Sequence, residues 1–139
     1  MIQKYTIARF ISKIQEEKKL LEEVILKEAV EFLQDQKVIR ATKYSIIIIV
    51  ESMLNILQHI LAKEKRVVIQ SYNDALTKAG AYGILTLVLS EKLRFLVKLR
   101  NEYLLHGYWK CDDLLLFNLI KDNIEDIDAF VLEIKKYIS

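Results

Sequence analysis

Residues 99–109 read LRNEYLLHGYW and gather side chains suited to chemistry on a phosphate group. Arg100 carries a permanent charge on a planar fork of donors that matches phosphate oxygens. His106 can accept or donate a proton near neutral pH, and Asn101 can orient either group. This set can cleave RNA through its own 2′-hydroxyl, with the histidine moving a proton and the arginine stabilising charge on the phosphate.

The spacing restricts how these two residues can meet. On an unbroken α-helix, which turns about 100° per residue, Arg100 and His106 are separated by about 240° and do not share a face. Gly107 is expected to end the helix, so that the histidine folds back or meets the arginine of a second chain. One histidine cannot comfortably be both acid and base in one turnover, whereas two facing chains would supply two.

The same residues also have purely structural interpretations. Arg100 near a helix C-terminus interacts favourably with the helix dipole, and His106 at a helix end is often a cap. Tyr108 and Trp109 are more often packing anchors than nucleotide platforms. Spacing alone leaves both interpretations open.

Outside this stretch, little else suggests chemistry. His59 lies in the middle of a long apolar segment and is expected to be a partly buried structural histidine. Cys111 is the only cysteine, which excludes an intramolecular disulfide and a multi-cysteine zinc site. The surroundings of Arg100 are weakly basic, because acidic residues dilute the basic ones: Lys92, Arg94, Lys98 and Lys110 against Glu91, Glu102, Asp112 and Asp113.

The composition predicts a helical protein. The 139 residues suit one domain, and three glycines with no proline leave few positions for the turns of a many-stranded sheet. A net charge of +2 does not indicate a general nucleic-acid binder. The N-terminus lacks the apolar core of a signal peptide, and the run Ile46–Val50 is too short to span a bilayer. These features predict a cytoplasmic protein with no membrane partner.

Apolar residues at helical spacing divide the chain into segments. We expect an all-α, up-and-down bundle of about five helices: residues 2–33, as one helix or two with a joint near Val30; 35–65; a helix capped by Ser71 that stops at the glycine pair of residues 80–83; one capped by Thr86 that runs to Gly107; and one capped by Asp112 or Asp113.

The segment 35–65 has two apolar stripes. One follows helical spacing through Ile46, Met53 and Ile60, and Ile47, Ile49, Leu54 and Ile56 form the other. A helix that is apolar on two sides must be buried on two sides. We therefore expect a second copy of the chain to cover the second side, which makes the protein a homodimer.

The stretch RNEYLLHGYW resembles the signature of the HEPN superfamily, an arginine followed after four to six residues by a histidine. It is most similar to the HepT-like branch, in which asparagine follows the arginine and tyrosine stands two places after the histidine. The wider pattern also resembles that branch over nearly the whole chain, which predicts a single HEPN domain over residues 1–139. Most HepT-like sequences have four residues between arginine and histidine, and this chain has the five residues NEYLL.

This resemblance implies a function. HepT-like proteins are all-helical homodimers that act as metal-independent ribonuclease toxins, without a cofactor, in type VII-like toxin–antitoxin pairs. The partner is a minimal nucleotidyltransferase that neutralises the toxin by AMPylation of the motif tyrosine. Carried over, Arg100 and His106 are catalytic, Asn101 is supporting, and Tyr108 is the modified residue.

Two alternatives stand beside the ribonuclease toxin. In one, the same cleft binds a nucleotide or the nucleotidyltransferase without cleaving RNA. In the other, the motif is purely structural within a helical dimer.

Overall fold

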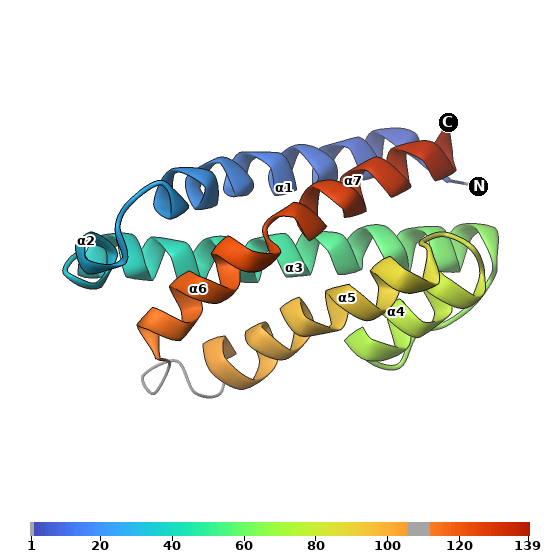
Figure 1. Cartoon of the computed structure of the whole chain (residues 1–139). Helices are drawn as coiled ribbons and strands as arrows, with labels where there is room; N and C mark the ends of the chain where they lie inside the picture. The colour runs from blue at the N-terminus through green and yellow to red at the C-terminus, as the bar shows by residue number, and fades with distance from the viewer. Residues whose placement is uncertain (1, 106–111) are drawn as a thin grey trace.

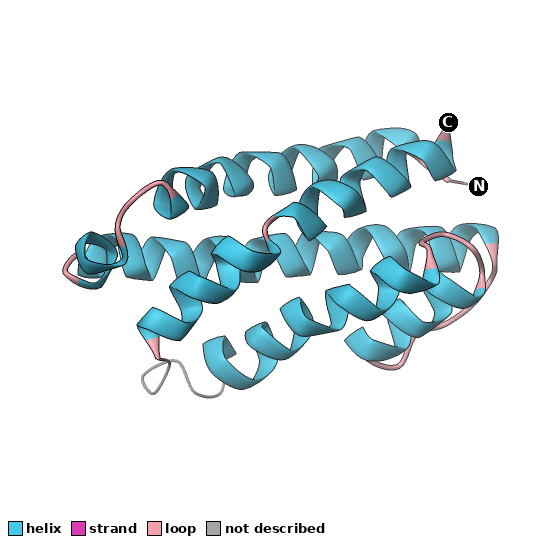
Figure 2. Cartoon of the chain, in the orientation of Figure 1, coloured by secondary structure: helices cyan, strands magenta, loops and turns pink. Residues whose placement is uncertain are grey.

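The computed structural model describes residues 2–105 and 112–139, and every regular element in these ranges is helical (Figure 2). The elements are α1 (Lys4–Ile25), α2 (Ala29–Leu33), α3 (Gln36–Glu64), α4 (Tyr72–Ala81), α5 (Leu87–Lys98), the π-helix η1 (Leu99–Leu105), α6 (Asp113–Asn123) and α7 (Glu125–Ile138). The helices form an elongated bundle with both termini at one end (Figure 1). The predicted all-α class is confirmed.

The described residues form seven α-helices where about five were expected, because the first and last segments each divide. The first divides at residues 26–28, before the predicted joint at Val30. There the chain turns so that buried Phe32 of α2 meets Phe117 of α6, with ring centroids 5.2 Å apart. The last divides at Ile124, which keeps helical dihedral angles. Apolar spacing does not mark such a joint.

The predicted helix caps agree with the structure, whereas the predicted helix end at Gly107 lies outside the described residues. Ser71 accepts a hydrogen bond from the Asp74 N–H, and Thr86 accepts one from the Leu89 N–H. Asp112, rather than its neighbour, caps α6. After α4, Gly83 adopts a φ of +74°, and the Ile84 N–H closes the turn on the Ala79 carbonyl. This left-handed C-terminal turn is the one that glycine favours.

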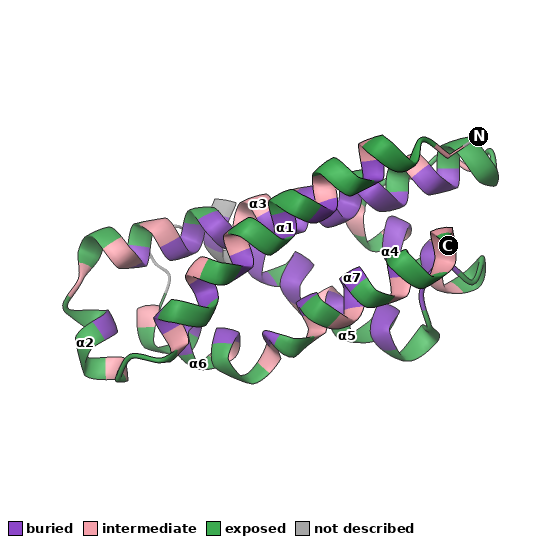
Figure 3. Cartoon of the chain, turned by 90° about the horizontal axis from the view of Figure 1, so that it is seen from above, coloured by how far each residue is buried: buried purple, intermediate pink, exposed green. Residues whose placement is uncertain are grey.

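Helix α3 is the centre of the bundle. Its side chains meet α1 on one side and α4 and α5 on the other, as the purple segments of α3 in Figure 3 illustrate. In the second apolar stripe, Ile49, Leu54 and Ile56 are buried within the same chain, and Ile47 is partly buried against the same core. The premise that a second copy must cover this stripe was therefore wrong, because the expected five-helix count underestimated how completely one chain surrounds α3.

The apolar run Ile46–Val50 lies within the long apolar helix α3. By length and composition the helix could cross a membrane, since an 18-residue window has a mean hydropathy of 1.7. This window is longer than the run Ile46–Val50, which by itself is too short to span a bilayer. Within the bundle, 61% of that window is buried, which is the environment of a core helix. Burial against α1, α4 and α5 accounts for the hydropathy.

We predict that Ile56→Ala lowers the free energy of unfolding by about 2–5 kcal/mol, the usual cost of a cavity at a fully buried isoleucine. Urea denaturation followed by circular dichroism measures this change, with exposed Gln58→Ala on the same helix as the control. Because Ile56 is fully buried within one chain, the loss should not depend on protein concentration. A loss that changes with dilution would show that a second copy buries this side.

Candidate functional site

Arg100 lies in η1, directly after α5, and its residue is only 8% exposed. Two leucines of η1, Leu99 and Leu104, are buried in the core and hold the π-helix against the bundle. η1 also contacts α3. The arginine is therefore placed by the core and is not a freely moving surface side chain.

Three side chains surround the guanidinium of Arg100. Nη1 donates to Oδ1 of Asn101 at 2.7 Å, and Nη2 donates to Oε1 of Glu51 in α3. The ring of Tyr72, the first residue of α4, lies against the guanidinium with 4.4 Å between Cζ and the ring centroid. The Tyr72 hydroxyl donates to the other Glu51 oxygen at 3.3 Å. Residues from three elements thus meet at one cation.

This arrangement has a clear electrostatic reason. A buried guanidinium loses its hydration, which is costly unless an anion and hydrogen-bond acceptors replace the water. Glu51 supplies the anion, Asn101 an acceptor, and the face of Tyr72 a cation–π contact. Among the described residues, Nε of Arg100 has no hydrogen-bond partner. The arginine is therefore held in place through its two terminal nitrogens, while its Nε is buried.

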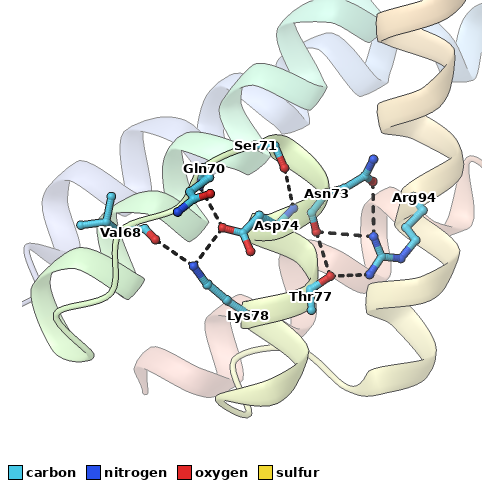
Figure 4. Close-up of polar contacts among 8 residues, drawn as sticks. All are labelled: Val68, Gln70, Ser71, Asn73, Asp74, Thr77, Lys78 and Arg94. Carbon is cyan, nitrogen blue, oxygen red and sulfur yellow. Dashed lines mark hydrogen bonds and ion pairs between the residues drawn. The ribbon is translucent and has the colours of Figure 1, made fainter.

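A second polar network fixes the start of α4, and with it Tyr72 (Figure 4). Arg94 of α5 donates to the Thr77 hydroxyl at 2.6 Å and to both the carbonyl and the side-chain oxygen of Asn73 at 3.4 Å. Asp74 accepts from the Lys78 ammonium at 2.9 Å and from the Gln70 N–H at 2.8 Å. These two hydrogen bonds hold the pKa of Asp74 below its usual value.

Close packing of α4 on α5 adds to this restraint. A Cβ atom on Gly80 would lie 3.1 Å from the Leu87 side chain and 3.2 Å from Oγ of Ser90. The absence of a side chain at position 80 therefore lets the two helices approach closely. The Ser90 hydroxyl also donates to the Leu76 carbonyl. Together these contacts fix the position of α4 relative to α5 and η1.

The structure places only part of the predicted site. Arg100 and Asn101 are in direct contact, whereas His106 and Tyr108 lie outside the described residues, as do Trp109 and Cys111. Their predicted roles stay predictions.

His59 makes a structural contact. Its Nε2 accepts a hydrogen bond from the Gln3 N–H at 3.1 Å, which ties the start of α1 to α3. Partial burial lowers the pKa of His59, and nearby Lys63 and the N-terminus lower it further. The ring therefore favours the neutral form that can accept this hydrogen bond, as expected for a structural histidine.

The expected α-helical geometry after Lys98 was wrong. Residues 99–105 form a π-helix, in which hydrogen bonds join residues five positions apart instead of four. Each residue then turns through less than 100°, so the separation of about 240° does not apply to this stretch. Single π-helical turns are rare and are frequent at functional sites.

The structure also shows which of the basic residues around Arg100 are engaged in contacts. Arg94 is engaged by α4 and by Glu91, so it contributes to structure and not to a free cationic surface. Lys92 and Lys98 are exposed. Over residues 2–105 and 112–139, no three histidine, cysteine or acidic side chains come together as potential metal ligands.

Sequence reasoning missed Glu51 and Tyr72. Glu51 interrupts the apolar run IIIIVESML. A carboxylate in the middle of a core helix requires a cationic partner, and this signal could have suggested a pairing with an arginine. Tyr72 had no comparable signal, because its role depends on how α4 sits against η1.

Comparison with protein families gives one match. The profile of the family described as Ribonuclease HepT-like matches residues 14–134 of the chain. Among curated proteins, no sequence matches significantly.

Solved structures show the same fold. The chain is similar to the tri-AMPylated HEPN toxin of Shewanella oneidensis in complex with MNT antitoxin, with a TM-score of 0.85 and 24% identity over 94% of this chain and 97% of that one. It is also similar to a toxin–antitoxin structure with AMP-PNP, with a TM-score of 0.83 and 22% identity over 93% and 97% of the respective chains. At this level of identity, the similarity establishes the fold.

We predict that Glu51→Ala lowers the free energy of unfolding by about 1–3 kcal/mol, because it leaves the buried Arg100 without its anion. Glu51→Gln, which keeps an acceptor, should cost less. Urea denaturation compares both variants with Glu102→Ala, which removes the same charge from an exposed position in η1. Equal effects of Glu51→Ala and Glu102→Ala would contradict a stabilising role for the ion pair.

Proposed function

Since this chain belongs to the HepT-like ribonuclease family, we propose that it is a metal-independent endoribonuclease toxin of a toxin–antitoxin pair, active in the cytoplasm. The observation that carries the proposal is the placement of Arg100. Arg100 belongs to a π-helix, and its guanidinium is held by Glu51, Asn101 and Tyr72. In the sequence, His106 follows six positions later.

In this proposal the RNA supplies its own nucleophile. The 2′-oxygen attacks the adjacent phosphorus, the bond from phosphorus to the 5′-oxygen breaks, and the products are a 2′,3′-cyclic phosphate and a 5′-hydroxyl. A histidine takes the proton from the 2′-oxygen, and a second histidine gives one to the 5′-oxygen. Arg100 stabilises the negative charge that builds up on the phosphate oxygens.

Two histidines require two chains. Each chain has one motif histidine, so a homodimer with its motifs across a shared cleft supplies both proton-transfer groups. We propose this homodimer, built from single HEPN domains that span residues 1–139. The need for two histidines supports this homodimer. The apolar stripe on α3 does not, because it is buried within one chain.

The proposed partner is a minimal nucleotidyltransferase. The Shewanella relative is a tri-AMPylated toxin in complex with an MNT antitoxin, and a second relative is a toxin–antitoxin structure with AMP-PNP. By analogy, an antitoxin of this kind would transfer AMP from ATP to the hydroxyl of Tyr108 with release of pyrophosphate. The added phosphate and nucleoside would then block access to the nearby Arg100 and His106.

A non-catalytic binding module is the second candidate. It is favoured by the ion pair between Arg100 and Glu51, because a guanidinium already engaged by a carboxylate can bind a nucleotide or a protein without promoting cleavage. In this case the chain would bind RNA or the nucleotidyltransferase and leave RNA intact.

We predict that Arg100→Ala and His106→Ala each abolish RNA cleavage, since they remove the phosphate-stabilising and proton-transfer groups. Purified variants incubated with RNA and analysed by gel electrophoresis test this, with exposed Lys98→Ala as a control that removes a neighbouring cation. Light scattering should show the same dimer for all of them. Cleavage that a chelator stops, or that survives in His106→Ala, would contradict the mechanism.

We also predict that the nucleotidyltransferase and ATP add AMP to Tyr108. Intact-protein mass spectrometry should show additions of the mass of AMP, and peptide sequencing should locate them. Tyr108→Phe should lose the addition at this position and stay toxic in the presence of the partner. If Tyr108 stays unmodified in a mixture that contains an active partner, this part of the proposal is wrong.

A further inference from the structure

A groove lies between α1 and α3, on the side of α3 that carries Glu51. One wall comes from α1 and the other from α3, two helices that run side by side in the views of Figures 1 and 3. We refer to it as the α1–α3 groove. It is lined by Thr6, Arg9, Phe10 and Lys13 of α1 and by Ile48, Glu51, Ser52 and Asn55 of α3.

Two exposed cations, Arg9 and Lys13, lie on the α1 wall. Arg9 and Lys13 are one helical turn apart, and neither forms an ion pair with any residue in 2–105 or 112–139. Glu16 and Glu17 follow Lys13 within one turn, but neither lines the groove, and Glu17 accepts a hydrogen bond from the Ser45 hydroxyl at 2.9 Å. The positive charge of this wall is therefore available to a ligand.

The only acidic side chain in the described lining is Glu51, and its charge is already balanced. One carboxylate oxygen bonds Arg100, and the other accepts from the Tyr72 hydroxyl. Because the pair of Glu51 and Arg100 is neutral as a unit, Arg9 and Lys13 give the groove an excess of two positive charges. Glu51 also joins the groove to the arginine of the motif, since it lines the one and bonds the other.

We propose that the α1–α3 groove binds the phosphate backbone of single-stranded RNA next to the bond that is cleaved, with Arg9 and Lys13 as its phosphate contacts. This inference rests on the proposed ribonuclease function and extends it to a second part of the site. The cations contact successive phosphates, while Asn55 and the Thr6 hydroxyl offer hydrogen bonds to sugar and phosphate oxygens. Contacts of this kind position the RNA and carry no base specificity.

The groove also explains how a chain with a net charge of only +2 can bind RNA. Binding to single strands depends on a local positive groove that follows the backbone, and not on total charge. Half-buried Phe10 contributes an apolar surface between the two cations and α3. A single strand entering along α1 would reach Arg100 at the position of Glu51.

The test compares two double variants with the same loss of charge. Arg9→Gln with Lys13→Gln removes the groove cations. Lys37→Gln with Arg40→Gln removes one lysine and one arginine from exposed positions at the start of α3, outside the groove lining. The probe is a fluorescent single-stranded RNA with 2′-O-methyl riboses, which cannot be cleaved through the 2′-oxygen. Fluorescence anisotropy gives the Kd over a series of KCl concentrations.

We expect the groove variant to bind this RNA about tenfold more weakly and to lose about 1.4 from the slope of log K against log salt, as the loss of two phosphate contacts to a single strand predicts. The Lys37 and Arg40 variant should bind like the wild type. With cleavable RNA, the groove variant should show a larger increase in KM than decrease in kcat. The reason is that Arg9 and Lys13 contact the RNA at a distance from the reacting atoms.

The outcomes separate this inference from the proposed function. If the wild type cleaves RNA and both double variants have the same Kd and salt slope, the groove is overturned while the ribonuclease stands. If the groove variant alone loses affinity and the wild type cleaves no RNA, the RNA-binding groove stands and the cleavage mechanism is overturned.

Discussion

The charge of Arg100 inside an otherwise apolar bundle is the constraint that organises the rest of the site. A buried guanidinium is tolerated only where an anion and acceptors replace its water, and here Glu51 and Asn101 do so. Since Glu51 belongs to α3 and Arg100 to η1, the ion pair fixes the π-helix against the central helix. The same burial that makes the arginine costly also holds it in one position, which the proposed contact with a phosphate requires.

Tyr72 connects this constraint to α4. Its ring covers the guanidinium and its hydroxyl bonds Glu51, so the geometry of the site depends on where α4 lies. Two contacts away from the site set that position. Arg94 of α5 donates a hydrogen bond to Thr77 of α4, and Gly80 lets the two helices approach closely. The polar network of Figure 4 therefore supports the site without touching it.

Glu51 has one further consequence for how RNA could reach the motif. It bonds Arg100 and also lines the α1–α3 groove, so this one carboxylate connects the buried arginine of the motif to the groove that holds Arg9 and Lys13. In the function that we propose, a phosphate that approaches Arg100 would compete with this carboxylate, while Arg9 and Lys13 would hold the neighbouring part of the strand. The balance between these charges would then set the affinity of the site for RNA.

The sequence by itself determined the helical class, the helix caps and the arginine of the motif, because apolar spacing, hydrogen-bonding caps and residue chemistry are local properties. The sequence did not predict four features: the joint before α2, the intrachain burial of Ile56, the π-helix after Lys98, and the pairing of Glu51 and Tyr72 with Arg100. Each depends on contacts between residues far apart in the chain. Only the tertiary structure places those residues together, and so it decided how the arginine is held.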